Sequence, residues 1–128
     1  MQKLIIALAV AFFAFILWII YLANTGGHSP FFDFIRTQPN GDKWGHFALF
    51  GLLNFVVVLA TRYRSLSLGK FRIYQGTLGV LIFVISEEIS QVFIATRTFD
   101  LVDLSADFLG ISLSVLAAFA IPKKPSTT

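Results

Sequence analysis

Four long apolar segments, separated by short polar ones, dominate the pattern of the chain. They cover about residues 4–23, 44–61, 73–94 and 104–121. Because a helix rises about 1.5 Å per residue, each segment is long enough to cross a hydrocarbon layer of about 30 Å. None of them alternates apolar and polar residues with a period of two, which argues against membrane-spanning strands. The pattern predicts an all-α fold, a bundle of four transmembrane helices.

The two ends of this pattern indicate one continuous unit. The first segment is longer than the apolar core of a cleavable signal peptide, and it ends in Tyr21-Leu22-Ala23-Asn24 without a small-x-small exit. We interpret it as an uncleaved anchor. Pro122 closes the fourth segment. Since no internal repeat is evident, residues 1–128 are expected to form a single membrane domain.

Composition supports a membrane protein and excludes several other classes. The chain is 56% hydrophobic and 13% charged, with a mean hydropathy of +0.79. Its pI of about 9.5 does not indicate nucleic-acid binding, because the cations are spread between apolar segments and form no basic face. The absence of cysteine from the sequence excludes a disulfide framework and a thiolate nucleophile. The expected surroundings are therefore a lipid bilayer.

Lysine and arginine are distributed unequally around the short loops. One side has Arg36, Lys43 and Arg97. The other side has seven cations: Lys3, Arg62, Arg64, Lys70, Arg72, Lys123 and Lys124. Because cytoplasmic loops retain positive charge during insertion, both termini and the middle loop are predicted to be cytoplasmic. The loop 24–43 and the turn 96–103 then face outward.

Acidic residues all fall toward the predicted outer side, together with both histidines. They are Asp33, Asp42, Glu87, Glu88, Asp100, Asp103 and Asp107. Acidic residues contribute little to the orientation rule, so this distribution is independent support for a specialised outer end. Some of these residues lie inside the apolar segments, where an ionised group costs about 2.5–3.5 kcal/mol at the bilayer centre. Some interaction must offset that cost.

Helical spacing groups these residues on shared faces and predicts a binding site. Asp42 and His46 lie one turn apart, Glu88 and Gln91 lie three apart, and the three aspartates from 100 to 107 share one face that Gly110 extends. The predicted ligand-binding residues come from three helix ends. They are Asp42, Lys43, His46, Glu88, Gln91, Arg97, Asp100, Asp103 and Asp107.

Structural roles compete with binding at several of these positions. Glu88 and Gln91 could instead lock the helices through Lys43 or Arg97, and Glu87, about 100° away from Glu88, is expected to face water or headgroups. Asp42 and Asp100 both suit the start of a helix. The glycines at 41, 45 and 51 are expected to let another helix approach closely.

Two further questions concern charge and metal binding. Lys43 and Arg97 either neutralise the acids or hold a phosphate group of an envelope lipid. His46 could be a packing residue, a proton shuttle or a ligand, but no second histidine stands one turn away from it. The sequence therefore predicts no metal site and no cofactor.

Over roughly residues 40–112 the chain resembles the VanZ-like membrane proteins. The resemblance rests on Asp-Lys-x-x-His at 42–46, Glu-x-x-Gln at 88–91, Arg97, and Asp-x-x-Asp-x-x-x-Asp-x-x-Gly at 100–110. Asp107 departs from the family, whose members usually have asparagine there. The resemblance implies a bacterial cytoplasmic (inner) membrane protein, and the family's namesake is associated with low-level teicoplanin resistance by an unsettled mechanism.

The sequence is compatible with three functional hypotheses. The first is a protein whose outer polar site recognises an envelope lipid or cell-wall precursor. The second is an intramembrane enzyme in which Glu88, His46 or Asp103 performs acid–base catalysis. The third is a small transporter or channel subunit, which the lack of carboxylates toward the cytoplasmic side disfavours. The sequence has no serine-nucleophile motif and no phosphate-binding loop that would favour enzymatic activity.

Overall fold

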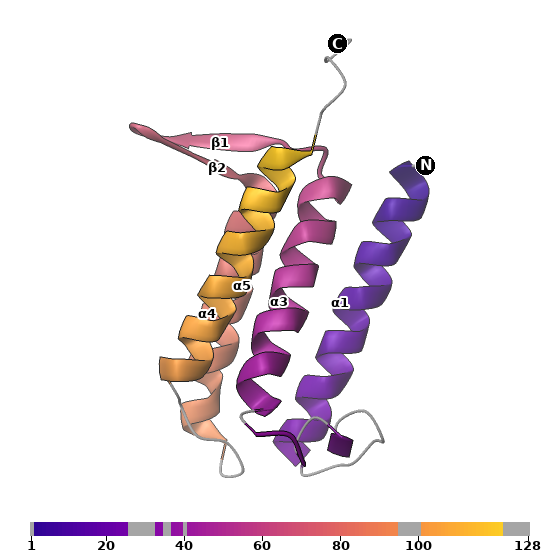
Figure 1. Ribbon diagram of the computed structural model, residues 1–128, viewed down its shortest axis with the longest axis vertical. Coiled ribbons are helices and arrows are strands. Elements are labelled where there is room, and N and C mark those ends of the chain that lie inside the picture. The colour runs from indigo at the N-terminus through magenta and orange to yellow at the C-terminus, as the bar shows by residue number, and fades with distance from the viewer. Residues whose placement is uncertain (1, 26–32, 35–36, 40, 95–100, 122–128) are drawn as a thin grey trace.

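The protein consists of four long helices and one β-hairpin (Figure 1). The structure is a computed structural model, and it describes residues 2–25, 33–34, 37–39, 41–94 and 101–121. The helices are α1 (Gln2–Thr25), α3 (Gly41–Ala60), α4 (Gln75–Ser90) and α5 (Leu101–Ala120). The hairpin is formed by β1 (Ser65–Leu68) and β2 (Phe71–Tyr74), and a 3-10 turn, η1 (Gln91–Phe93), continues α4.

Successive helices run in opposite directions along the bundle. The start of α1, the end of α3, the hairpin and the end of α5 lie at one end (Figure 1). The end of α1, the starts of α3 and α5, and the end of α4 lie at the other. Four helical stretches are long and apolar enough to cross a membrane: Gln2–Thr25, Lys43–Ala60, Gln75–Phe93 and Leu101–Ala120. The prediction of four helices that are long and apolar enough to span a membrane is confirmed.

The outside of the bundle is apolar along each of these helices. Val10 is 64% exposed, Leu52 54% and Leu116 62%. The core is a smaller apolar cluster of Ile16, Phe50, Leu53, Val80, Val84 and Ile111. Large exposed apolar surfaces are unfavourable in water, whereas lipid chains can cover them. This surface therefore suits a bilayer.

The central helix of the bundle is α3, which packs against α1, α4 and most extensively α5. Two glycines permit the α3–α5 contact. A methyl group on Gly110 would overlap the carbonyl oxygen of Phe47, and one on Gly51 would lie 3.0 Å from the carbonyl oxygen of Gly110. The expected close approach is thus found at Gly51, and Gly110 is its partner.

The hairpin is an addition to the predicted all-α fold. β1 and β2 are antiparallel, with Ser65 opposite Tyr74 and Leu68 opposite Phe71, and Gly69 in the connection has a φ of +64°. The left-handed conformation at Gly69 suits a tight two-residue turn. Pairing of Tyr74 in the hairpin explains why α4 begins at Gln75 rather than near residue 73.

Two other helix starts also differ from the prediction. Both α3 and α5 begin about one turn before the apolar segments, at Gly41 and Leu101. The first turns carry polar residues, and two of them, Lys43 and Asp103, form an ion pair between the helices. The apolar segments alone therefore underestimate the length of α3 and α5 at the polar end of the bundle.

Candidate functional site

Buried polar side chains gather at the end of the bundle opposite the hairpin. They come from α3, from the last turn of α4 with η1, and from the start of α5. Glu88 and Asp107 are fully buried, Gln91 is 1% exposed, and Glu87 and Asp103 are each 7% exposed. Such residues are costly inside a membrane protein, and within spanning segments they usually mark functional sites.

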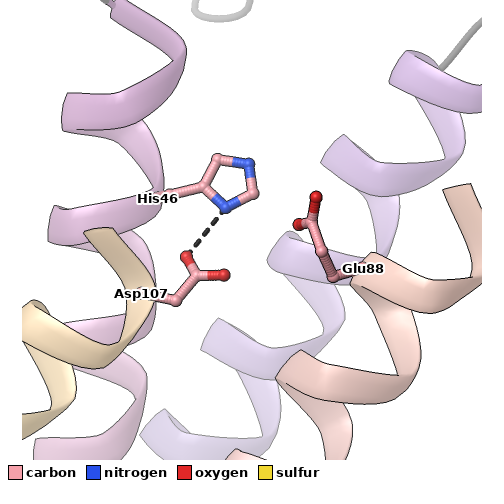
Figure 2. Close-up of side chains that lie close together, drawn as sticks. All are labelled: His46, Glu88 and Asp107. Carbon is pink, nitrogen blue, oxygen red and sulfur yellow. Dashed lines mark hydrogen bonds and ion pairs between the residues drawn. The ribbon is translucent and has the colours of Figure 1, made fainter. Parts of the chain in front are cut away.

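The innermost contact of this cluster joins α3 to α5. Nδ1 of His46 lies 2.8 Å from Oδ1 of Asp107 (Figure 2). With Asp107 ionised, the carboxylate can only accept, so the imidazole donates from Nδ1. The ring of Phe50, one turn further along α3, lies against the imidazole with centroids 5.6 Å apart. The imidazole is therefore held both by a charged partner and by packing.

The second oxygen of Asp107 has a different environment. Oδ2 is buried and has no hydrogen-bond partner within the described part of the chain. In Figure 2 the carboxylate of Asp107 lies beside the imidazole and opposite the carboxylate of Glu88, which comes from α4. His46, Glu88 and Asp107 each present one atom within 4.8 Å of the others. Three helices thus direct polar groups toward one small space.

A second ion pair joins α3 to α5 one turn nearer the end of the bundle. Nζ of Lys43 lies 3.3 Å from Oδ1 of Asp103. The two side chains are 28% and 10% exposed, so this pair is more accessible than the His46–Asp107 pair. It lies between the buried cluster and the end of the bundle. We call His46, Glu88 and Asp107 the inner cluster, and Lys43 with Asp103 the outer pair.

Glu87 corrects one of the sequence predictions. It was expected to face water or headgroups, but it is buried, and Nε2 of Gln91 donates to its two carboxylate oxygens at 3.0 and 3.1 Å. The same nitrogen lies 3.4 Å from Oε2 of Glu88. Because α4 packs against both α3 and α5, two side chains about 100° apart on it are both enclosed. Gln91 therefore bridges neighbouring carboxylates of its own helix.

Several of the residues predicted to form the site lie close together. The described structure brings Lys43, His46, Glu88, Gln91, Asp103 and Asp107 to the same end of the bundle. Arg97, Asp100 and the side chain of Asp42 lie outside the described residues. Asp103, Asp107 and Gly110 are all buried, so the described part of the face predicted for the aspartates 100–107 and Gly110 is turned into the bundle.

One buried polar contact was not predicted from the sequence. Nδ2 of Asn54 donates to Oγ of Ser114 at 2.6 Å, deeper in the bundle. The available signal was a lone carboxamide within a strongly apolar segment. With it, contacts at 43–103, 46–107, 51–110 and 54–114 follow one continuous line between α3 and α5. We call this line the α3–α5 seam.

Comparison with known protein families, curated proteins and solved structures finds no match for this chain. Functional reasoning therefore starts from the site. An imidazole paired with a buried carboxylate, and facing a second one, can transfer protons, bind a cation, or bind a ligand that donates hydrogen bonds.

Proposed function

We propose that this chain is a VanZ-like integral membrane protein of the bacterial cytoplasmic membrane that recognises an envelope lipid or cell-wall precursor at its polar end. The observation that carries this proposal is the convergence of buried polar groups from three helices at one end of an otherwise apolar bundle. Isolated polar contacts can lock helices together, but so many at one level exceed what packing requires.

The arrangement of charge favours a ligand that carries both hydrogen-bond donors and an anionic group. Lys43 of the outer pair is partly exposed, and its ammonium group can interact with a phosphate or carboxylate. Behind it the buried carboxylates can accept hydrogen bonds from hydroxyl or amino groups. Envelope lipids and cell-wall precursors combine these groups. Binding of such a component would alter the access of a glycopeptide such as teicoplanin without any chemical reaction.

The His46–Asp107 contact favours an intramembrane enzyme as the second candidate. A carboxylate that orients an imidazole, with another carboxylate nearby, is a common arrangement for moving protons. In this version Glu88 is the general base, His46 shuttles the proton, and Lys43 stabilises a developing oxyanion. The substrate would again be an envelope lipid.

Lipid retention tests the proposal directly. Purified protein is incubated with bacterial envelope lipid extract, washed, and analysed by mass spectrometry. The wild type is expected to retain one lipid or precursor class that Asp103→Asn and Glu88→Gln fail to retain. Asp33→Asn serves as the control, because it removes an exposed carboxylate between α1 and α3.

The outcomes separate the two candidates. Retention of an unchanged class by wild type and control supports recognition, whereas a new product in the extract supports the enzyme. An identical lipid profile for the wild type and both site variants, with all proteins folded, would contradict the proposal. The helical circular dichroism signal and the elution volume establish folding.

A further inference from the structure

The inner cluster contains a buried acceptor whose bonding capacity is unused. Asp107 is fully buried, and its Oδ2 atom has no hydrogen-bond partner among the described residues. Leaving a buried polar atom without a partner costs about 1–3 kcal/mol, and more when the group is charged. Oδ2 faces the space shared with His46 and Glu88 (Figure 2). A positively charged ligand in that space would remove this cost.

From this geometry we propose that His46, Glu88 and Asp107 bind a divalent transition-metal cation of the Mn²⁺ or Zn²⁺ class. One ligand atom from each residue lies within 4.8 Å of the others. A cation with bonds of about 2.0–2.4 Å holds its ligands at most about 4.8 Å apart. The three groups therefore lie close enough to share one ion with only small side-chain rotations.

The donor set determines the class of cation. Imidazole nitrogen suits zinc and its neighbours in the transition series, and carboxylate oxygens suit Mn²⁺ and Mg²⁺. One imidazole with two carboxylates therefore selects a divalent ion that accepts both nitrogen and oxygen. Two carboxylates also match the charge of such an ion, which matters because attraction is strong where water is excluded. Three protein ligands leave coordination positions for water or for a ligand oxygen.

Neighbouring side chains hold the proposed ligands in place. Nε2 of Gln91 lies 3.4 Å from Oε2 of Glu88, and the Phe50 ring packs against His46. Contacts of this kind orient metal ligands and tune their affinity. The sequence predicted no metal site because it has no pair of histidines one turn apart. Here each ligand comes from a different helix, so spacing along the chain does not reveal the set.

Binding of Mn²⁺ tests this site without any lipid ligand. The protein is purified in a zwitterionic detergent, stripped with chelator, and titrated with Mn²⁺ while electron paramagnetic resonance follows the free ion. The wild type is expected to bind about one Mn²⁺ per chain and to release it on addition of Zn²⁺. Glu88→Gln and Asp107→Asn are expected to weaken binding by about 100-fold or more, since each removes a ligand charge.

Glu87→Gln is the matched control, because Glu87 is also buried and adjacent to Glu88 but lies outside the inner cluster. The affinity of this variant should fall much less than that of the two ligand variants, because Glu87 is not one of the three residues of the set. Asp107→Asn keeps the shape of the side chain and an acceptor for His46, so it tests the site even if Glu88→Gln fails to fold.

Two results would overturn the metal proposal. One is the absence of saturable Mn²⁺ and Zn²⁺ binding by folded wild type up to millimolar concentration. The other is an equal loss in the Glu87→Gln control, which would indicate diffuse attraction to acidic residues. Because no lipid enters this measurement, its failure would leave lipid recognition standing, and a negative lipid assay would leave the metal site standing.

Discussion

A histidine–aspartate contact and a lysine–aspartate ion pair link the same two helices, and the two differ in exposure and therefore in their expected contribution to stability. The His46 and Asp107 side chains are 15% and 0% exposed, whereas Lys43 and Asp103 are 28% and 10% exposed. Breaking a buried pair leaves a charge without compensation and costs about 3–5 kcal/mol. A pair that water and salt can reach contributes less, down to about 0–1 kcal/mol when both groups are fully exposed. The inner contact should therefore matter more to stability.

Replacement of the α3 partner of each contact tests this difference. His46→Ala should lower the free energy of unfolding by about 3 kcal/mol, since Asp107 is left buried without its partner. Lys43→Ala should lower it by less, because Lys43 is 28% exposed and water screens the outer pair in part. Unfolding in a denaturing detergent, followed by circular dichroism, measures both. Equal losses would mean that the outer pair is as well shielded as the inner one.

At the scale of elements, the α3–α5 seam fixes how the polar groups meet. The two helices run in the same direction, and their contacts advance together from the outer pair to Asn54 and Ser114. Between these contacts Gly51 and Gly110 bring the backbones close. Because Asp107 and Gly110 share a face of α5, the glycine contact also sets how near Asp107 comes to α3. Packing and site geometry are therefore coupled.

Substitution of Gly110 tests that coupling. Gly110→Ala places a methyl group against the carbonyl oxygen of Phe47, a backbone atom that cannot rotate away. The helices must separate, and we expect a loss of about 1–3 kcal/mol in the free energy of unfolding. Gly79→Ala on α4 is the control, because a methyl group there meets nothing within 4 Å. It should be neutral or stabilising by up to about 1 kcal/mol.

Thermal unfolding in one detergent compares the two glycine variants. Mn²⁺ binding by Gly110→Ala should also weaken if the seam positions Asp107, even though the substitution removes no ligand. A stable Gly110→Ala protein would contradict the close contact.

The sequence predicted the helices better than it predicted their interactions. The lengths of the apolar segments defined four helices, because crossing a bilayer requires a minimum run of such residues. Spacing also placed Asp103 and Asp107 on one face of α5. It could not define how each helix is rotated about its axis, which is why Glu87 was expected to face outward. The hairpin was missed because only the turn at Gly69 and a short alternation indicate it.

For a related reason, the sequence could not predict that the three residues of the inner cluster lie close together. His46, Glu88 and Asp107 are far apart along the chain, and their meeting depends on which helices are neighbours. Several arrangements of four spans satisfy the same apolar pattern. The close contact of Gly51 with Gly110 favours one of them, and although Gly51 was expected to permit close approach, its spacing does not identify the partner helix. Helix packing therefore determines which polar residues meet, and residue spacing along the chain does not.

For the whole molecule, charge is separated between the two ends of the bundle. The hairpin end carries Arg62, Arg64, Lys70 and Arg72, and the first residues of α1 lie at that end too (Figure 1). The buried carboxylates of the inner cluster lie at the opposite end. From the positive-inside rule we expect the hairpin to be cytoplasmic and the inner cluster to lie near the outer surface.

Single cysteines can test this orientation, because the sequence contains none that would add background labelling. Ser67→Cys lies on the exposed hairpin, and Asp33→Cys lies between α1 and α3. A membrane-impermeant maleimide should label Asp33→Cys in intact spheroplasts and Ser67→Cys only after lysis. The reverse pattern would place the inner cluster near the cytoplasm. Recognition of outer envelope components would then fail, whereas the metal site, which depends only on three converging side chains, would remain.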